Sequence, residues 1–239
     1  LEIAGGTILA VATAKDQCTA IGAGGNGYAN MLISGGDVTA ISYTTGTAIG
    51  GGIGHLSAGG TANVTITGGN VKAYNLGQPY KYTFESNKTL NVAEFVPGTA
   101  IGGGSSYQSA GNNGTVNIYG GTVKAYSNGG SGLGGGNSIL STGGTANIKI
   151  TDGNVTSYGY VPDEEVSYIN TIMTTLQTEV LNNVPNGGTI INSTIAPFDY
   201  GQDGSGIGGG SGQTKSGGSA TINISGGFLF DKFGTAKSM

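Results

Sequence analysis

The chain has 239 residues, of which 50 are glycine and 9% are charged, and its formal net charge is −4. Glycine does not recur at every third position, which excludes a collagen helix, and all nine basic residues are lysines, which argues against a nucleic-acid-binding protein. No run of 18 or more apolar residues occurs, so the sequence predicts no membrane span.

A sequence repeat organises most of the chain from its N-terminus onward. The stretch "GTAIGGG" at 46–52 recurs at 98–104, and looser copies lie at 19–24, 131–136 and 205–210. In most copies an aliphatic residue directly precedes the glycines. Three further aliphatic residues follow it, the first after 15 positions, the second after 2 more and the third after another 5. The aligned sets are Ile21, Ile49, Ile101, Leu133 and Ile207; Met31, Val64, Val116, Ile148 and Ile222; Ile3, Ile33, Ile66, Ile118, Ile150 and Ile224; and Ile8, Val38, Val71, Val123, Val155 and Leu229.

Within a repeat the residues alternate between apolar and polar, which is the period of a β-strand. In "ANVTI" (62–66) the small and aliphatic residues alternate with Asn63 and Thr65, and "VKAY" (71–74) continues the pattern. A pair of glycines separates these two segments in most copies and predicts a tight corner. Each repeat is therefore predicted to form three short strands and three corners, with the glycine triplet at a corner where neighbouring backbones meet.

These repeats predict an all-β fold, a right-handed parallel β-helix (solenoid) of five to six coils, forming a single domain over 1–239. The pattern "IGGG … V-x-I-x-GG-x-V-x-A" resembles the Gly-rich parallel β-helix repeat proteins of bacterial cell surfaces, over most of 1–158 and 203–230. The resemblance implies an extracellular, adhesin-like or wall-associated protein. It implies no particular ligand.

Two insertions interrupt the repeat at the same predicted corner. The first, 75–97, is predicted to be a protruding hairpin in which Tyr80 and Tyr82 alternate with polar residues. The second, 159–202, is predicted to contain a helix over about 163–183, because Pro162 and three acidic residues precede an apolar 3/4 pattern. In repeat proteins, insertions on one side often mark the binding face.

Three tyrosines, Tyr74, Tyr126 and Tyr158, occupy one outward position at the end of the third predicted strand. They form either a stabilising ladder, in which each ring packs on the next, or an aromatic platform for sugar rings. In the second interpretation, Tyr80 and Tyr82 of the predicted hairpin extend the platform.

The two ends of the repeat array are candidate assembly surfaces. Leu1 and Ile3 belong to the first coil, while Phe228 and Phe230 stand where most earlier repeats have polar residues. Uncovered ends of a stacked sheet favour association with a second copy, so these four residues are predicted to support end-to-end stacking.

The sequence predicts no catalytic residue, no metal site and no cofactor. Acidic residues are sparse apart from those at the predicted helix start, and Asp199 and Asp203 are the one close acidic pair on a loop. Ice binding is disfavoured because the outward positions equivalent to Thr65 do not form a regular threonine array. They are Glu2, Leu32, Thr65, Asn117, Lys149 and Asn223.

The sequence therefore predicts a non-enzymatic, extracellular structural or adhesion module at the cell surface, which binds a glycan or a cell-surface protein. The alternative is a subunit of an extracellular filament that assembles by end-to-end stacking. A polysaccharide lyase or hydrolase is the third hypothesis.

Overall fold

The computed structural model describes residues 1–12, 19–43, 46–54, 56–77, 98–183, 205–212, 215–226, 228–230 and 236–238, and the side chains among them except those of 177–183, 228–230 and 236–238. The chain forms two compact units. The first comprises Leu1–Tyr160 and Gln202–Met239, and the second comprises Val161–Gly201.

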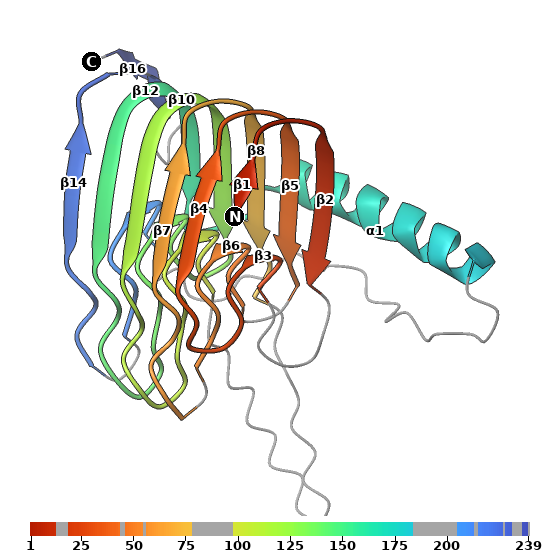
Figure 1. Ribbon diagram of the computed structural model, residues 1–239. Coiled ribbons are helices and arrows are strands. Elements are labelled where there is room, and N and C mark those ends of the chain that lie inside the picture. Colours follow the sequence, from red (N-terminus) through yellow and green to blue (C-terminus); the bar gives the residue numbers. More distant parts are fainter. Residues whose placement is uncertain are drawn as a thin grey trace, which may run out of the picture. The chain divides into compact units, whose positions relative to one another are not determined.

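The first unit is built around one curled sheet, in which strands from successive repeats pair side by side (Figure 1). Among the described residues this sheet has eleven strands, and its strands pair in parallel except β15 with β16. The strands are β1 (Glu2–Ile3), β2 (Thr7–Ala12), β4 (Ala29–Ile33), β5 (Asp37–Ser42), β7 (Ala62–Ile66), β8 (Asn70–Asn75), β10 (Gly114–Ser127), β12 (Ala146–Tyr158), β14 (Ala220–Ile224), β15 (Phe228–Phe230) and β16 (Ala236–Ser238).

A second sheet of two-residue strands completes the first unit. Its strands pair in parallel in the order β13-β11-β9-β6-β3. They are β3 (Ile21–Gly22), β6 (Ile49–Gly50), β9 (Ile101–Gly102), β11 (Leu133–Gly134) and β13 (Ile207–Gly208).

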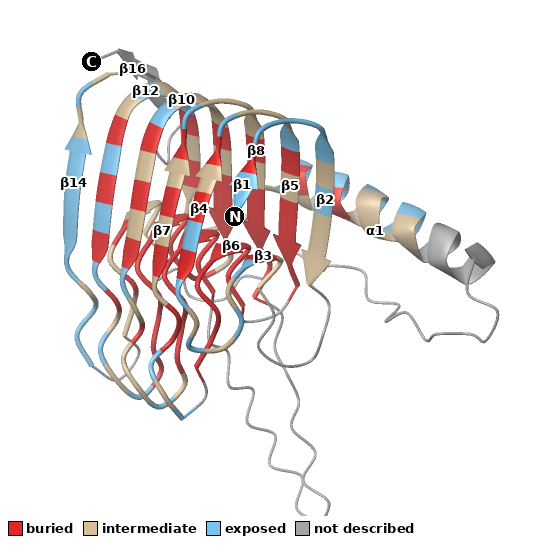
Figure 2. Ribbon diagram, viewed as in Figure 1, coloured by how far each residue is buried: buried red, intermediate tan, exposed pale blue. Residues whose placement is uncertain are grey.

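The predicted alignment of the aliphatic residues is confirmed. Ile49 pairs with Ile101, and Ile101 pairs with Leu133, and all three side chains are fully buried. The other three aligned sets also pair in register between neighbouring strands, for example Val64 with Val116. Figure 2 shows the result as alternating buried and solvent-facing bands along β7, β10 and β12. The aliphatic residues thus form one continuous core.

The predicted fold class is wrong. Among the described residues the structure has a curled parallel sheet, with the form of a half-barrel, and one helix, which is an α/β-type fold rather than a right-handed parallel β-helix solenoid. The predicted corner at the glycine pair does not separate two faces in the later repeats, because β10 and β12 run through it as single strands of 14 and 13 residues. The strand predicted at the segment before the glycine triplet is only two residues long, as in β9 and β11.

The glycine pair curls the strand instead of ending it. The β10–β12 ladder shifts register between Ile118 and Tyr119 and again between Tyr119 and Thr122, and Gly121 has a φ of 87°. Such an irregularity bends a strand while its neighbours stay hydrogen-bonded. Glycine adopts this left-handed conformation without steric cost, so the two predicted strands remain in one curved sheet.

The second unit contains the helix α1 (Asp163–Asn183), which has the range predicted from the sequence. Pro162 precedes it and accepts hydrogen bonds from the backbone N–H groups of Glu165 and Val166. Asp163, Glu164 and Glu165 lie in its first turn, where negative charge interacts favourably with the helix dipole. No described helix is long and apolar enough to cross a membrane. The prediction of a single domain over 1–239 stays a prediction.

Candidate polar binding face

The glycine triplets hold successive repeats together through the backbone. The N–H of Gly104 donates to the carbonyl of Gly60, that of Gly60 donates to the carbonyl of Gly52, and the same alternation continues to Gly218. A Cβ on Gly104 would overlap the carbonyl oxygen of Gly52. The glycines are therefore needed because two backbone segments lie against each other, which agrees with the close approach predicted for them.

Buried hydroxyl groups add a second set of contacts between repeats. A threonine or serine lies two residues before the aliphatic residue that precedes the glycine triplet, and its hydroxyl donates to a glycine carbonyl in the next repeat. Thr99 Oγ1 donates to Gly135 O at 3.1 Å, and Ser131 Oγ donates to Gly209 O at 3.1 Å. Thr99 and Ser131 are buried, so each bond satisfies a polar group that water cannot reach. These contacts hold neighbouring repeats in register.

The outward side chains of β4, β7, β10, β12 and β14 form a surface that we call the amide face. Asparagine and threonine predominate on it. Its residues form two rows that run across the neighbouring strands in register. The first row contains Asn30, Asn63, Thr115, Asn147 and Thr221. The second row contains Leu32, Thr65, Asn117, Lys149 and Asn223. All ten are half-buried or exposed, while the residues between them point into the core, except on the outermost strand β14.

The geometry of the amide face follows from the sheet. Neighbouring strands lie about 4.8 Å apart and alternate residues about 6.7 Å apart, so the side chains form a regular grid. Asn63 Nδ2 donates to Asn30 Oδ1 at 3.3 Å, which links two residues of the first row. An asparagine amide carries a donor and an acceptor and a threonine carries a hydroxyl, and of these groups the Oδ1 atom of Asn63 is buried. The grid can therefore bind a ligand that has many hydroxyl groups.

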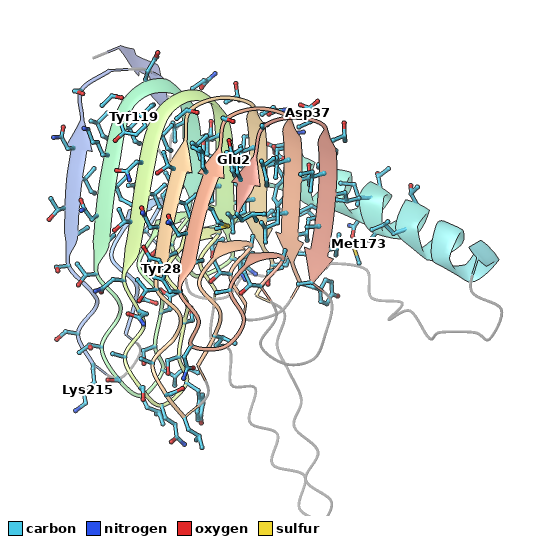
Figure 3. The ribbon with its side chains drawn as sticks, viewed as in Figure 1. Glu2, Tyr28, Asp37, Tyr119, Met173 and Lys215 are labelled. Carbon is cyan, nitrogen blue, oxygen red and sulfur yellow. The ribbon has the colours of Figure 1, made fainter. Side chains whose placement is uncertain are left out.

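One aromatic ring lies at an end of the amide face. Tyr119, on β10, is 41% exposed, and the Nζ atom of Lys149, on β12, lies 5.4 Å from the centre of its ring. Figure 3 shows Tyr119 at the upper end of the sheet, far from Lys215 at the opposite end. The ring and the ammonium group together form a small aromatic and cationic subsite.

The tyrosines predicted as a sugar platform are mostly inaccessible. Tyr74 is fully buried, Tyr126 is 3% exposed, and Tyr158 is half-buried. Their ring centres are 5.6 Å apart in both successive pairs, and Tyr158 stacks on Tyr160 at 5.0 Å. This geometry favours the ladder among the two interpretations. Glycan binding by these rings stays a prediction, and Tyr80 and Tyr82 lie outside the described residues.

The predicted assembly residues lie in different surroundings. Leu1 is 69% exposed, whereas Ile3 is 6% exposed and belongs to the core. Phe228 and Phe230 delimit β15, whose backbone pairs with β12 on one side and with the antiparallel strand β16 on the other. The role of these residues in assembly stays a prediction.

The described residues contain no group of three or more histidine, cysteine, aspartate or glutamate side chains placed to hold a metal ion. Asp199 and Asp203, the acidic pair of the third hypothesis, lie outside the described residues.

The amide face and Tyr119 were missed because sequence reasoning examined only one of the two outward rows. The row of Asn30, Asn63, Thr115, Asn147 and Thr221 is regular, and it could have been found by aligning the residue two positions earlier in each repeat. Tyr119 could have been found as well, because the other repeats have alanine, serine or threonine at its position. Comparison of the chain with protein-family models, curated proteins and solved structures found no match.

Proposed function

We propose that this chain is a non-enzymatic structural and adhesion module of a cell surface, and that it binds an extended polysaccharide along the amide face. The observation that supports the proposal is the regular grid of asparagine and threonine side chains on a sheet held by backbone ladders. An extended glycan presents hydroxyl groups at repeated intervals, so it can form hydrogen bonds with several neighbouring strands at once. The extracellular location rests on the resemblance to Gly-rich surface proteins.

Rigidity supports this proposal on energetic grounds. Hydrogen bonds to sugar hydroxyls replace bonds to water, so each contributes only about 0.5–1.5 kcal/mol. A surface that is already ordered loses little side-chain and backbone entropy on binding, so these small contributions can accumulate. The amide face lies on paired strands and not on loops, which is the arrangement that keeps this cost low.

The test is a binding screen by calorimetry against a panel of neutral and acidic polysaccharides. The double variant Asn117→Ala/Asn147→Ala removes two amides from adjacent strands, and we expect it to weaken binding about tenfold. The variant Gln108→Ala removes an exposed amide outside the amide face and serves as the matched control. Absence of binding by the wild-type chain, or equal effects of the two variants, would contradict the proposal.

A second function, self-association into a filament, is favoured by one observation at strand β14. This strand pairs only with β12 among the described residues, and Ile222, the register partner of the buried Ile148, is 44% exposed. A strand with one unpaired edge and an exposed aliphatic side chain can pair with a second copy. Light scattering over a concentration series distinguishes this function from binding as a monomer.

A further inference from the structure

We infer that Tyr119 and Lys149 form a subsite for a carboxylate-bearing sugar, such as a uronic acid unit of a polysaccharide. The inference rests on the proposed function and specifies the ligand class. It follows from the juxtaposition of an exposed ring and an ammonium group on adjacent strands, 5.4 Å apart.

The aromatic ring supplies a flat apolar surface. Tyr119 is 41% exposed on the same sheet whose Tyr74 and Tyr126 are covered, so it is the accessible tyrosine of β10. One face of a pyranose ring carries mainly C–H groups, and such a face packs against an aromatic ring. Tyr119 lies at the curled glycine bend, where it pairs with Asp152 of β12, and β10 is paired on its other side up to Ile118 and again from Thr122.

The ammonium group supplies the charge selectivity. Lys149 is exposed, and its neighbours in register are Asn117 on β10 and Asn223 on β14, which are both neutral amides. A sugar that packs on Tyr119 would bring its substituents within reach of Lys149 Nζ, since the ammonium group already lies over that ring. A carboxylate at this position would form a charge-assisted hydrogen bond, and the two amides would bind adjacent hydroxyls.

The nearest acidic residue on the sheet sets the orientation of the ligand. Asp152 pairs with Tyr119 in the β10–β12 ladder, and its Oδ1 accepts a hydrogen bond from the N–H of Gly153 at 2.7 Å. This carboxylate repels a ligand carboxylate, so the sugar acid group is expected near the row of Asn117, Lys149 and Asn223 and away from Asp152. The subsite therefore binds an acidic sugar in one direction along the strands.

The experiment measures calorimetric binding of oligogalacturonate and of its fully methyl-esterified form, which has the same sugar ring without the charge. We expect the wild-type chain to bind the acid about fivefold more tightly than the ester at low salt, and the preference to shrink as ionic strength rises. Lys149→Gln should abolish the preference but retain binding of the ester, whereas Tyr119→Ala should weaken binding of both. Lys215→Gln, an exposed lysine at the opposite end of the unit, is the control and should bind like the wild type.

Two results would overturn the inference, and they are distinguishable from failure of the proposed function. Equal affinity for acid and ester, or an unchanged preference in Lys149→Gln, would remove the acidic subsite while leaving the amide face as a polysaccharide surface. Binding of neither oligosaccharide, nor of any polysaccharide in the panel, would remove both. Circular dichroism of each variant checks that the sheet is intact.

Discussion

At the scale of single residues, glycine performs two different tasks in this protein. At Gly121 it allows a positive φ within a continuous strand, and at Gly104 it allows two backbones to lie in contact. The second task explains why the triplets recur in each repeat. Gly52, Gly104, Gly136 and Gly210 occupy the same position along the hydrogen-bonded ladder, and each addition of a side chain would separate two repeats.

The substitution Gly104→Ala should lower the free energy of unfolding by about 3 kcal/mol or more, because the added Cβ overlaps the Gly52 carbonyl and the backbone must move. Gly24→Ala is the matched control, since a Cβ there meets nothing within 4 Å. It should be neutral or slightly stabilising. Urea denaturation of both variants measures the difference, and equal effects would show that the close approach is not required.

At the scale of elements, the tyrosine ladder of β8, β10 and β12 is a structural feature of the sheet. Tyr126 lies between Tyr74 and Tyr158, with 5.6 Å between ring centres on both sides. The three residues are paired in register, so one ring stands above the next. Cross-strand aromatic pairs of this kind stabilise a sheet beyond the area that they bury.

The substitution Tyr126→Ala should therefore destabilise the protein by about 3–5 kcal/mol, the usual range for removal of a buried aromatic ring. Tyr119→Ala, which removes an exposed tyrosine from the same strand, should cost less than about 1 kcal/mol. Thermal or urea unfolding of the two variants tests the ladder. A small effect at Tyr126 would mean that its ring is not an integral part of the packing.

At the scale of the whole molecule, the core extends through the first unit and then stops at β14. The first four residues of Ala220–Ile224 are exposed and the fifth is half-buried, whereas buried and half-buried residues alternate along β7. The edge contains no lysine, proline or bulge, which are the usual devices that prevent strand pairing between molecules. Strand β15, in contrast, has β16 on its outer edge.

We accordingly expect the mass of the wild-type chain in light scattering to rise with concentration, and Ile222→Lys to keep the mass of a monomer. Leu56→Lys replaces a leucine that is 70% exposed outside the β14 edge, and it should associate like the wild type. A wild-type mass that stays constant over the whole concentration range would remove self-association as a function of this edge.

The sequence by itself determined which aliphatic residues of successive repeats align, the range of α1 and the need for glycine between repeats. These properties follow from local information: the strand period, the fixed spacing within each repeat, and the Pro162 and acidic residues at the helix start. Only the tertiary structure decided the fold class and which outward residues are accessible. The glycine pair is compatible with either a corner or a curl, and the choice depends on hydrogen bonds to neighbouring strands. Likewise, Tyr74 is covered and Tyr119 is exposed because of what packs over each ring, which the alternation of residues along a strand does not reveal.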